Sequence, residues 1–461
     1  MFQQIPPGSL LLVKQAMRTR IIHRLIICLL SFPAGTLIQV FGGCCPVRGA
    51  HPLIDSLIGQ INTTSYAAHF DSLRTHPGAT RKVEEANRQS ADHDACRDYI
   101  YHRFQTLFGN ENCYQHSFDV LRYRGLTNVV AYKKGRSPWK GILVVGAHYD
   151  TNNNLDRGDA VCDAAPGAND NGTGLAALLE IARILAPIET EKSILFAAWD
   201  FEEQFIYGYP TGSNEWFCSF VRNRKPTNWQ DIGQAGIINR DDLSLNINFD
   251  MFGRPGDSIE GIPVLWACAG NAKHGSFVEQ YALTLNRYLT EALAVYAGKM
   301  PYSDHYTFAN RNIPAVENLE SNYRDNPFYH TCNDHKLQAG NVSWEFATDV
   351  TRAGLAYILE EAGVAKPGRN QKPTRPMLLQ IAEHPDYYLV QPREGWELAG
   401  MYSIKGEPVR FQKQKSFASF GLRKDGPVVF QIRKGREMIF EVRLLNKKDS
   451  LPALTEPDPR K

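Results

Sequence analysis

Apolar residues recur along the chain with two different spacings, and each spacing predicts a different element. From about Ile54 to Gly109 the spacing is helical, as the positions of Tyr99, Ile100 and Phe104 illustrate. Further on, short continuous apolar runs alternate with helical stretches. These predict strands at 128–132, 141–147, 193–199, 245–249 and 313–316, and helices at 175–185, 277–296 and 344–361. Strands that alternate with helices favour an α/β sheet covered by helices on both faces.

A change in composition separates the last part of the chain from this α/β region. Residues 366–376 (KPGRNQKPTRP) are polar and rich in proline, which is typical of a linker. Beyond them, apolar runs separated by glycine and charged turns predict short strands at 387–390, 416–422, 428–432 and 438–444. We therefore expect a main domain at 46–365, a small β-rich domain at 377–450 and a loose tail at 451–461.

An apolar run near the amino terminus, at residues 25–40, follows a basic stretch and precedes the small pair Gly42-Gly43. This order is typical of an export signal, which we place at 1–45, and a retained membrane anchor is the alternative. The segment also loosely resembles the cleavage site of a bacterial lipoprotein, in which Cys44 would carry the lipid and tether the chain to a membrane. We therefore expect an exported protein, whether periplasmic, secreted or a cell-envelope lipoprotein.

The composition is that of a globular protein, since 43% of the 461 residues are hydrophobic and 22% are charged. The net charge of only +2 gives no basic surface of the kind that binds nucleic acid. The cysteines beyond residue 45 are scattered and form no CxxC motif, which argues against a zinc site built from thiolates. Their even number permits disulfides in an exported chain, and Cys96–Cys113 is the first pair that we expect.

Side chains that can bind a metal follow three of the predicted strands. In chain order they are His148 and Asp150, the pair Glu202-Glu203, and Asp250. Residues two apart in an extended chain point the same way, so Asp150 can reach the ring of His148 from behind. Adjacent carboxylates point to different sides, so that one of the two glutamates can bind a metal while the other faces a bound water.

Two polar loops add a carboxylate and an imidazole to this set. The glycine-rich segment GANDNGTG at 167–174 bends just before a predicted helix and would project Asp170 into a cleft, and His330 stands in the loop before the closing helix. Alone, each motif also fits an ordinary turn, helix cap or solvated loop. Together they place nitrogen and oxygen ligands at the carboxyl edge of a sheet, where α/β folds bind their ligands. Such a set without thiolates suits zinc, and with a bridging carboxylate it suits a pair of zinc ions.

In this order the motifs HYDT, GANDNGTG, the glutamate pair, NFDMFG, YSDHYTF and YHT resemble the co-catalytic zinc aminopeptidase family of the exported bacterial leucyl-aminopeptidase type. Its relatives include glutaminyl cyclases and glutamate carboxypeptidases. The resemblance covers about residues 99 to 361. It implies a zinc-peptidase fold with a mixed, mostly parallel sheet, a peptide substrate, and two Zn²⁺ ions per chain, or one if the chain is cyclase-like.

The resemblance also assigns the metal ligands. It implies that Asp170 bridges the two ions, that His148 and Asp250 complete one site, and that Glu203 and His330 complete the other. In this family the peptide bond after the bridging aspartate, here between residues 170 and 171, is often cis.

Further roles follow from the same resemblance. Glu202 would be the general base, taking a proton from a zinc-activated water as the water attacks the scissile carbonyl. Asp304 would form a hydrogen bond near this base, and Asp150 would support catalysis from behind the first histidine. We expect Tyr302 and Tyr329 to contact the substrate, whose free α-amine would restrict the enzyme to one amino-terminal residue at a time.

The chain departs from the family in two places, both of which concern the substrate pocket. Phe201 stands before the glutamate pair, where glycine is common, and the segment 204–212 is longer and more aromatic than expected. A glutaminyl cyclase would use nearly the same ligands, although Tyr329 stands where the cyclases have tryptophan. A carboxypeptidase-like dipeptidase would need a basic pocket, for which the candidates are Arg254, Arg311 and Arg324. An inactive receptor-like ectodomain would lack ligands or the base, whereas here every position is filled. The oligomeric state stays open.

Overall fold

The computed structural model describes the chain at residues 51–83, 90–155, 163–206, 208–259, 261–364, 379–384, 387–392, 397–403, 412–413, 418–420, 426–434 and 437–445. The predicted export signal with Cys44, the linker at 366–376 and the tail at 451–461 lie outside these residues. Among the helices within them, none is both long enough and apolar enough to cross a membrane.

The amino-terminal part of the described chain is helical, as predicted. Its helices are α2 (Pro52–Ile58), α3 (Thr63–Ala67), α4 (His69–Ser72) and α5 (Ala91–Phe108). Ser90 caps the start of α5, because its side chain accepts a hydrogen bond from the backbone N–H of His93. Gly109 ends the helix with a φ of 84°, a conformation that glycine adopts without strain. Ile100 and Phe104 on the inner face of α5 are fully buried.

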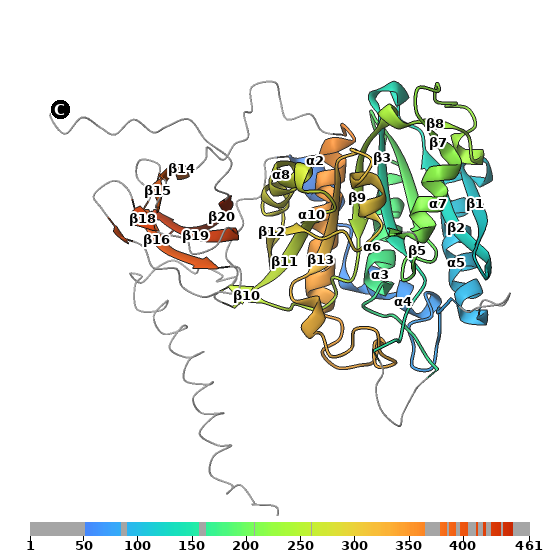
Figure 1. Cartoon of the computed structure of the whole chain (residues 1–461), viewed down its shortest axis with the longest axis horizontal. Coiled ribbons are helices and arrows are strands. Elements are labelled where there is room, and N and C mark those ends of the chain that lie inside the picture. Colours follow the sequence, from blue (N-terminus) through green and yellow to red (C-terminus); the bar gives the residue numbers. More distant parts are fainter. Residues whose placement is uncertain are drawn as a thin grey trace, which may run out of the picture. The chain divides into compact units, whose positions relative to one another are not determined.

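A nine-stranded mixed sheet lies beside these helices (Figure 1). Its strands are β1 (Cys113–Val120), β2 (Tyr123–Lys133), β3 (Ile142–His148), β4 (Ser193–Trp199), β9 (Leu243–Phe249), β10 (Ser258–Ile259), β11 (Ile262–Ala269), β12 (Leu293–Lys299) and β13 (Ala315–Glu320). Their order is β1-β2-β4-β3-β9-β13-β11-β10, with β12 beside β11. The four middle strands β4, β3, β9 and β13 are parallel, whereas β2 and β11 join them antiparallel. The expected mixed, mostly parallel sheet is confirmed.

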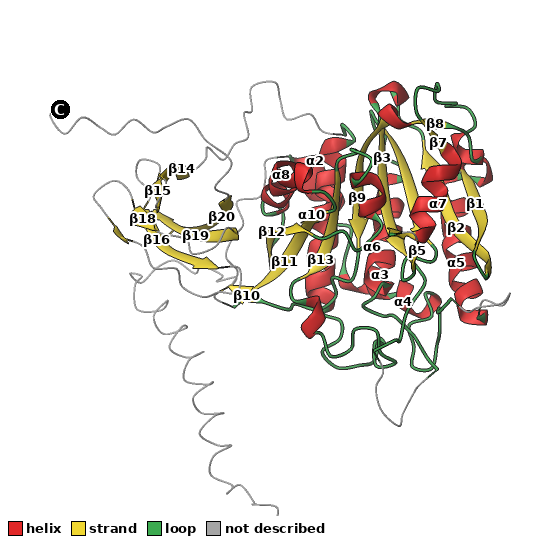
Figure 2. Cartoon of the chain, viewed as in Figure 1, coloured by secondary structure: helices red, strands yellow, loops and turns green. Residues whose placement is uncertain are grey.

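Helices cover both faces of this sheet, as expected (Figure 2). Alternate residues of a strand face opposite sides, so Leu143 and Val145 in β3 pack into one apolar core while Ile142 and Val144 pack into another. The first core includes side chains from α5, α6 (Gly172–Leu185), α8 (Gly275–Leu285) and α10 (Trp344–Glu361), and the second includes side chains from α7 (Thr211–Phe220) and α9 (His305–Ala309). Burial on both faces explains why these strands are continuous apolar runs.

The remaining described strands form smaller sheets. Two short pairs consist of β5 (Phe205–Ile206) with β6 (Tyr209–Pro210) and of β7 (Val221–Arg222) with β8 (Ile238–Asn239). Near the carboxyl terminus, a four-stranded sheet contains β14 (Leu379–His384), β15 (Tyr387–Pro392), β18 (Ala418–Phe420) and β17 (Gln412–Lys413), and a three-stranded sheet contains β16 (Glu397–Ser403), β19 (Gly426–Lys434) and β20 (Glu437–Leu445). The domain boundaries proposed from the sequence stay a prediction.

The helix predicted at 277–296 is confirmed in its first part, but its predicted end is wrong. Helix α8 ends at Leu285, and the last part of the predicted helix belongs to β12, which pairs with β11. At the end of α8, the side chain of Asn286 accepts a hydrogen bond from the backbone N–H of Ala294 and donates one to the Ala294 carbonyl. These two bonds tie the end of α8 to the start of β12.

The disulfide predicted between Cys96 and Cys113 is absent, since both residues are free thiols. Cys96 lies near the start of α5 and Cys113 lies beyond its end. Twelve helical residues separate Cys96 from the end of α5, a rise of about 18 Å, whereas the α-carbons of a disulfide are within about 7 Å. The helix therefore holds the two thiols apart.

Thiol labelling tests this correction. Without reductant, an alkylating reagent should modify the exposed Cys218 in the native protein and should modify Cys96 and Cys113 only after unfolding. Burial protects both thiols and raises the pKa of Cys96 to about 11 and that of Cys113 to about 12, so that neither forms the reactive thiolate. Peptide mass spectrometry measures the labels. If the unfolded chain labelled at these two positions only after reduction, the thiols would be paired after all.

Candidate metal centre

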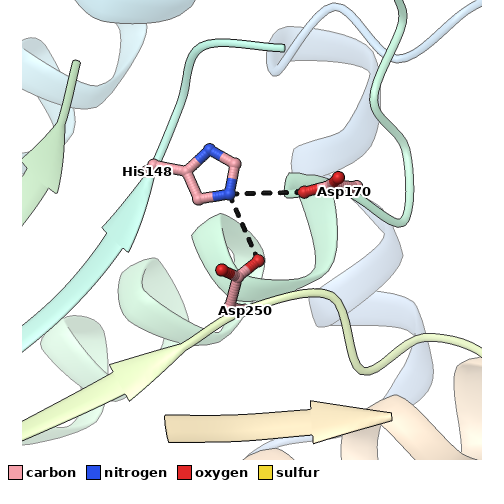
Figure 3. Close-up of side chains that lie close together, drawn as sticks. All are labelled: His148, Asp170 and Asp250. Carbon is pink, nitrogen blue, oxygen red and sulfur yellow. Dashed lines mark hydrogen bonds and ion pairs between the residues drawn. The ribbon is translucent and has the colours of Figure 1, made fainter. Parts of the chain in front are cut away.

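The five predicted metal ligands come together at the carboxyl edge of the parallel strands. Nε2 of His148, the last residue of β3, lies 3.3 Å from Oδ1 of Asp170 and 3.2 Å from Oδ1 of Asp250 (Figure 3). Nε2 of His330 lies 3.1 Å from Oδ2 of Asp170 and 2.9 Å from Oε2 of Glu203. The set thus forms two groups of three, each with one imidazole and two carboxylates, and both groups contain Asp170.

Asp170 presents a different carboxylate oxygen to each imidazole, which is the arrangement of a bridging ligand. The donors of each group lie within 4.8 Å of one another and consist only of imidazole nitrogen and carboxylate oxygen. Zinc binds such donors readily. The buried oxygens Oε1 of Glu202 and Oε1 of Glu203 also have no hydrogen-bond partner among the described residues, so they are available to a ligand. The residues present therefore fit a pair of zinc ions.

The turn that presents Asp170 is tied to strand β9 by its neighbour Asn171. The peptide bond between these two residues is cis, as the resemblance implied. The Asn171 side chain caps α6 by accepting the Gly174 N–H, and it also donates to the carbonyl of Phe249 at the end of β9. A Cβ at Gly174 would lie only 2.2 Å from that carbonyl, so glycine is required here for helix and strand to approach. The glycine-rich motif thus fixes the distance between Asp170 and Asp250.

Asp334 holds the same turn from the other side, and the sequence reasoning did not single it out. Its buried carboxylate accepts hydrogen bonds from the backbone N–H groups of Asn169 at 2.7 Å and Asp170 at 3.0 Å, and from the side chain of Asn341. The only signal in the sequence is its place four residues after His330 in the same polar loop. Asp334 therefore links the loop of one predicted ligand to the backbone of another.

Asp150 connects the first histidine with the glutamate pair. Its Oδ1 lies 3.5 Å from Nδ1 of His148, as the spacing in the strand predicted. The same carboxylate accepts the backbone N–H groups of Glu202 at 3.0 Å and Glu203 at 3.1 Å. One buried carboxylate thus orients the imidazole and also holds the turn after β4.

Phe201 stands in the turn after β4 where the family commonly has glycine. The turn accommodates it and still presents the Glu202–Glu203 pair. Phe201 has a φ of 62°, in the left-handed region that favours glycine, which accounts for the glycine common in the family. Its ring is fully buried and packs against Tyr123 with 4.5 Å between ring centroids. Apolar burial of the Phe201 ring offsets the unfavourable backbone conformation.

Burial and mutual repulsion raise the pKa values of the two glutamates. Burial is the main cause for Glu202, whose pKa rises well above its ordinary value with help from the charges of Asp250 and Asp304. Burial raises the pKa of Glu203 to about 7. Burial alone would lower the pKa of His330. The negative charges and hydrogen bonds of Glu203 and Asp170 outweigh this effect and raise the pKa to about 10.

Asp304 lies at the start of α9, fully buried near this cluster. Burial raises its pKa to about 8, and the charges of Asp250 and Asp150 contribute. The described contacts include no hydrogen bond between Asp304 and Glu202, so the influence of Asp304 on that residue is electrostatic.

A cavity opens beside the ligands, with about 380 Å³ of empty space that is partly continuous with solvent. Tyr302 and Tyr329, the two expected substrate contacts, both line it. The other lining residues are the five ligands, Glu202, Met251, Met300, Glu317, Leu319 and Tyr323. Of the described residues, no lysine or arginine lines this cavity, and none of the three arginines considered for the dipeptidase alternative is among its lining residues. Arg311 instead stacks on the rings of Tyr209 and Phe217.

Comparisons with known proteins agree with this geometry. The sequence profile of peptidase family M28 matches residues 128–358. A probable zinc metalloprotease of Leptosphaeria maculans is 41% identical over 83 residues, which are 18% of this chain and 19% of the relative. An aminopeptidase of Pseudomonas aeruginosa is 32% identical over 138 residues, which are 30% of this chain and 20% of the relative. The matches therefore span about a fifth of these relatives.

Two solved structures show the same fold. LapA of Legionella pneumophila aligns with a TM-score of 0.51 and 18% identity over 72% of this chain and 81% of its own. The glutaminyl cyclase of Macrostomum lignano aligns with a TM-score of 0.51 and 17% identity over 71% of this chain and 96% of its own.

The contacts of Asp334 give a testable prediction. Asp334→Asn keeps the size of the side chain but replaces one acceptor oxygen by a donor that faces a backbone N–H. The turn at Asp170 should loosen, and zinc affinity should fall by about 10-fold or more. Competition with a chelator measures this affinity, and the exposed Asp325→Asn serves as the control. Equal zinc affinity in both variants would contradict a supporting role for Asp334.

Proposed function

We propose that this chain, which belongs to peptidase family M28, is a zinc-dependent aminopeptidase that removes residues one at a time from the amino termini of peptides. The observation that carries the proposal is the pair of imidazole–carboxylate groups that share Asp170, with Glu202 beside them in a cavity. The identities to an aminopeptidase and to probable zinc metalloproteases support it.

Two zinc ions are proposed, one for each group of ligands. His148, Asp170 and Asp250 would hold one ion, and Asp170, Glu203 and His330 would hold the other. When bound, zinc polarises a carbonyl oxygen and makes water a stronger acid. The ligands themselves are kept in place by the contacts of Asp150, Asn171 and Asp334 described above, so little reorganisation is needed to bind the ions.

Glu202 is the proposed general base. Its side chain is buried, lines the cavity and lies 3.9 Å from Nε2 of His148, while its Oε1 has no hydrogen-bond partner among the described residues. Because burial raises its pKa, the Glu202 carboxyl holds a proton more readily than an exposed glutamate does. It would take the proton of the attacking water and deliver it to the leaving amine.

Charge favours a free amino terminus over a free carboxylate as the recognised group. The cavity is lined by several carboxylates and, within the described part of the chain, by no lysine or arginine. The proposed zinc ions would compensate the three ligand carboxylates, so the carboxyl groups of Glu202 and Glu317 are the ones that favour a substrate ammonium group over a substrate carboxylate. The same argument disfavours the dipeptidase alternative.

We also propose that the protein is exported, with a lipid at Cys44 as one means of tethering. The support is the basic and apolar pattern of the first 45 residues.

An activity assay tests the aminopeptidase proposal directly. The full chain, with and without chelator and added zinc, would be given aminoacyl anilides, an amino-terminally blocked anilide and a peptide that begins with glutamine. We expect hydrolysis of the free-amine anilides only, its loss with chelator and its return with zinc. Ammonia release from the glutamine peptide without anilide hydrolysis would instead identify a glutaminyl cyclase.

Substitution of Glu202, the proposed general base, distinguishes a loss of catalysis from a loss of metal binding. Glu202→Gln should retain zinc but lose turnover by on the order of 10² or more, because the amide cannot accept the proton. Glu203→Ala should lose zinc itself after dialysis, as metal analysis would show. Glu345→Gln, an exposed position on α10, controls for the loss of one charge. Turnover close to that of the native protein in zinc-loaded Glu202→Gln would refute the assignment of the base.

A further inference from the structure

Glu317 is a buried carboxyl group in the cavity that neither metal binding nor the proposed mechanism uses. It lies in β13, which runs parallel to β9, and it is paired in register with Asn248. Leu319, two residues further along the strand, lines the same cavity, as expected for residues on one face of a strand. Glu317 therefore forms part of one wall of the cavity, beside the metal ligands.

Part of the cavity wall near Glu317 is apolar, although metal ligands line the rest. Met251, Met300, Leu319 and Tyr323 line the same space. A carboxylate next to thioethers and hydrocarbon is costly unless a cation or a hydrogen-bond donor compensates for its lost hydration. An apolar residue at this position would favour a substrate with an apolar side chain. The carboxyl group of Glu317 favours a substrate with a polar or charged side chain instead.

The described part of the chain offers Glu317 no cation of its own. Nδ1 of His305 lies 3.6 Å from Oε2 of Glu317. Burial lowers the pKa of His305 to about 3, so this imidazole is neutral. A hydrogen bond from the Ser303 side chain compensates in part for the burial of Glu317, whereas the neighbouring Asp250 and Asp304 add negative charge.

We propose that Glu317 selects the amino-terminal residue of the substrate by pairing with a cationic side chain, that of lysine or arginine. The methylene groups of such a side chain would pack against Met251 and Met300, and its charged end would reach Glu317. Tyr302, which lines the same cavity, is 57% exposed and leaves this part of the cavity open to solvent. This inference rests on the proposed aminopeptidase function.

The experiment compares lysine with norleucine, which keeps the four-carbon chain but lacks the ammonium group. The full, zinc-loaded protein and its Glu317→Gln variant would be given the anilides of both, with Glu345→Gln as the control. We expect the native protein and the control to prefer lysine in kcat/KM, and Glu317→Gln to lower the ratio of lysine to norleucine by about 10-fold or more. Metal analysis of each variant confirms equal zinc content.

Two results would overturn the assignment. The native protein could cleave norleucine as well as lysine, or Glu317→Gln could lower both rates in proportion, which would place Glu317 at the α-amine that both substrates share. Calorimetric binding of free lysine and free norleucine to the native protein gives a second readout that needs no turnover. If no anilide is hydrolysed, the proposed aminopeptidase function fails. Tighter binding of free lysine than of free norleucine would then still support the pairing of Glu317 with a cationic side chain, and equal binding would refute it.

Discussion

The carboxylate of Asp170 is shared between two imidazoles, and the position of every other group in the site depends on it. One oxygen faces His148 from β3 and the other faces His330 from a loop almost at the end of the α/β region. A carboxylate can serve both only if its backbone is held firmly. Asn171 and Asp334 provide this support, since each uses a buried polar side chain to fix the same turn against a different part of the chain.

The site concentrates negative charge in a buried place. Carboxyl groups outnumber the imidazoles, and burial raises the pKa values of Glu202, Glu203 and Asp304 because ionisation there lacks hydration and meets other negative charges. Divalent cations held by these groups would supply the compensating charge. This electrostatic need agrees with the donor chemistry and with membership of a peptidase family whose relatives include zinc metalloproteases.

The metal centre and the pocket beside it share the loops that follow β9 and β13, but the pocket also draws on β13 itself and on the loop after β12. The ligands stand at strand ends and in two tight loops, where a change of one residue alters the chemistry. The pocket is lined largely from β13 and from the loops that follow β9, β12 and β13. The departure at Phe201 is absorbed by packing against Tyr123, outside the cavity lining, whereas Glu317 changes the character of the pocket itself.

Much of the arrangement was predictable because it follows from local patterns. Continuous apolar runs marked β3, β4 and β9, and polar residues directly after them marked the ligands, since neighbouring parallel strands end at one edge. Glu317 is likewise a polar residue directly after a predicted strand, at 313–316. Its place in the wall of the cavity, however, depends on the register of β13 with β9. The separation of Cys96 from Cys113 follows from the length of helix α5. The end of α8 at Asn286 and the hold of Asp334 on Asp170 were decided only by the tertiary structure. Each of these depends on which distant segments meet in space, and spacing along a chain does not specify those contacts.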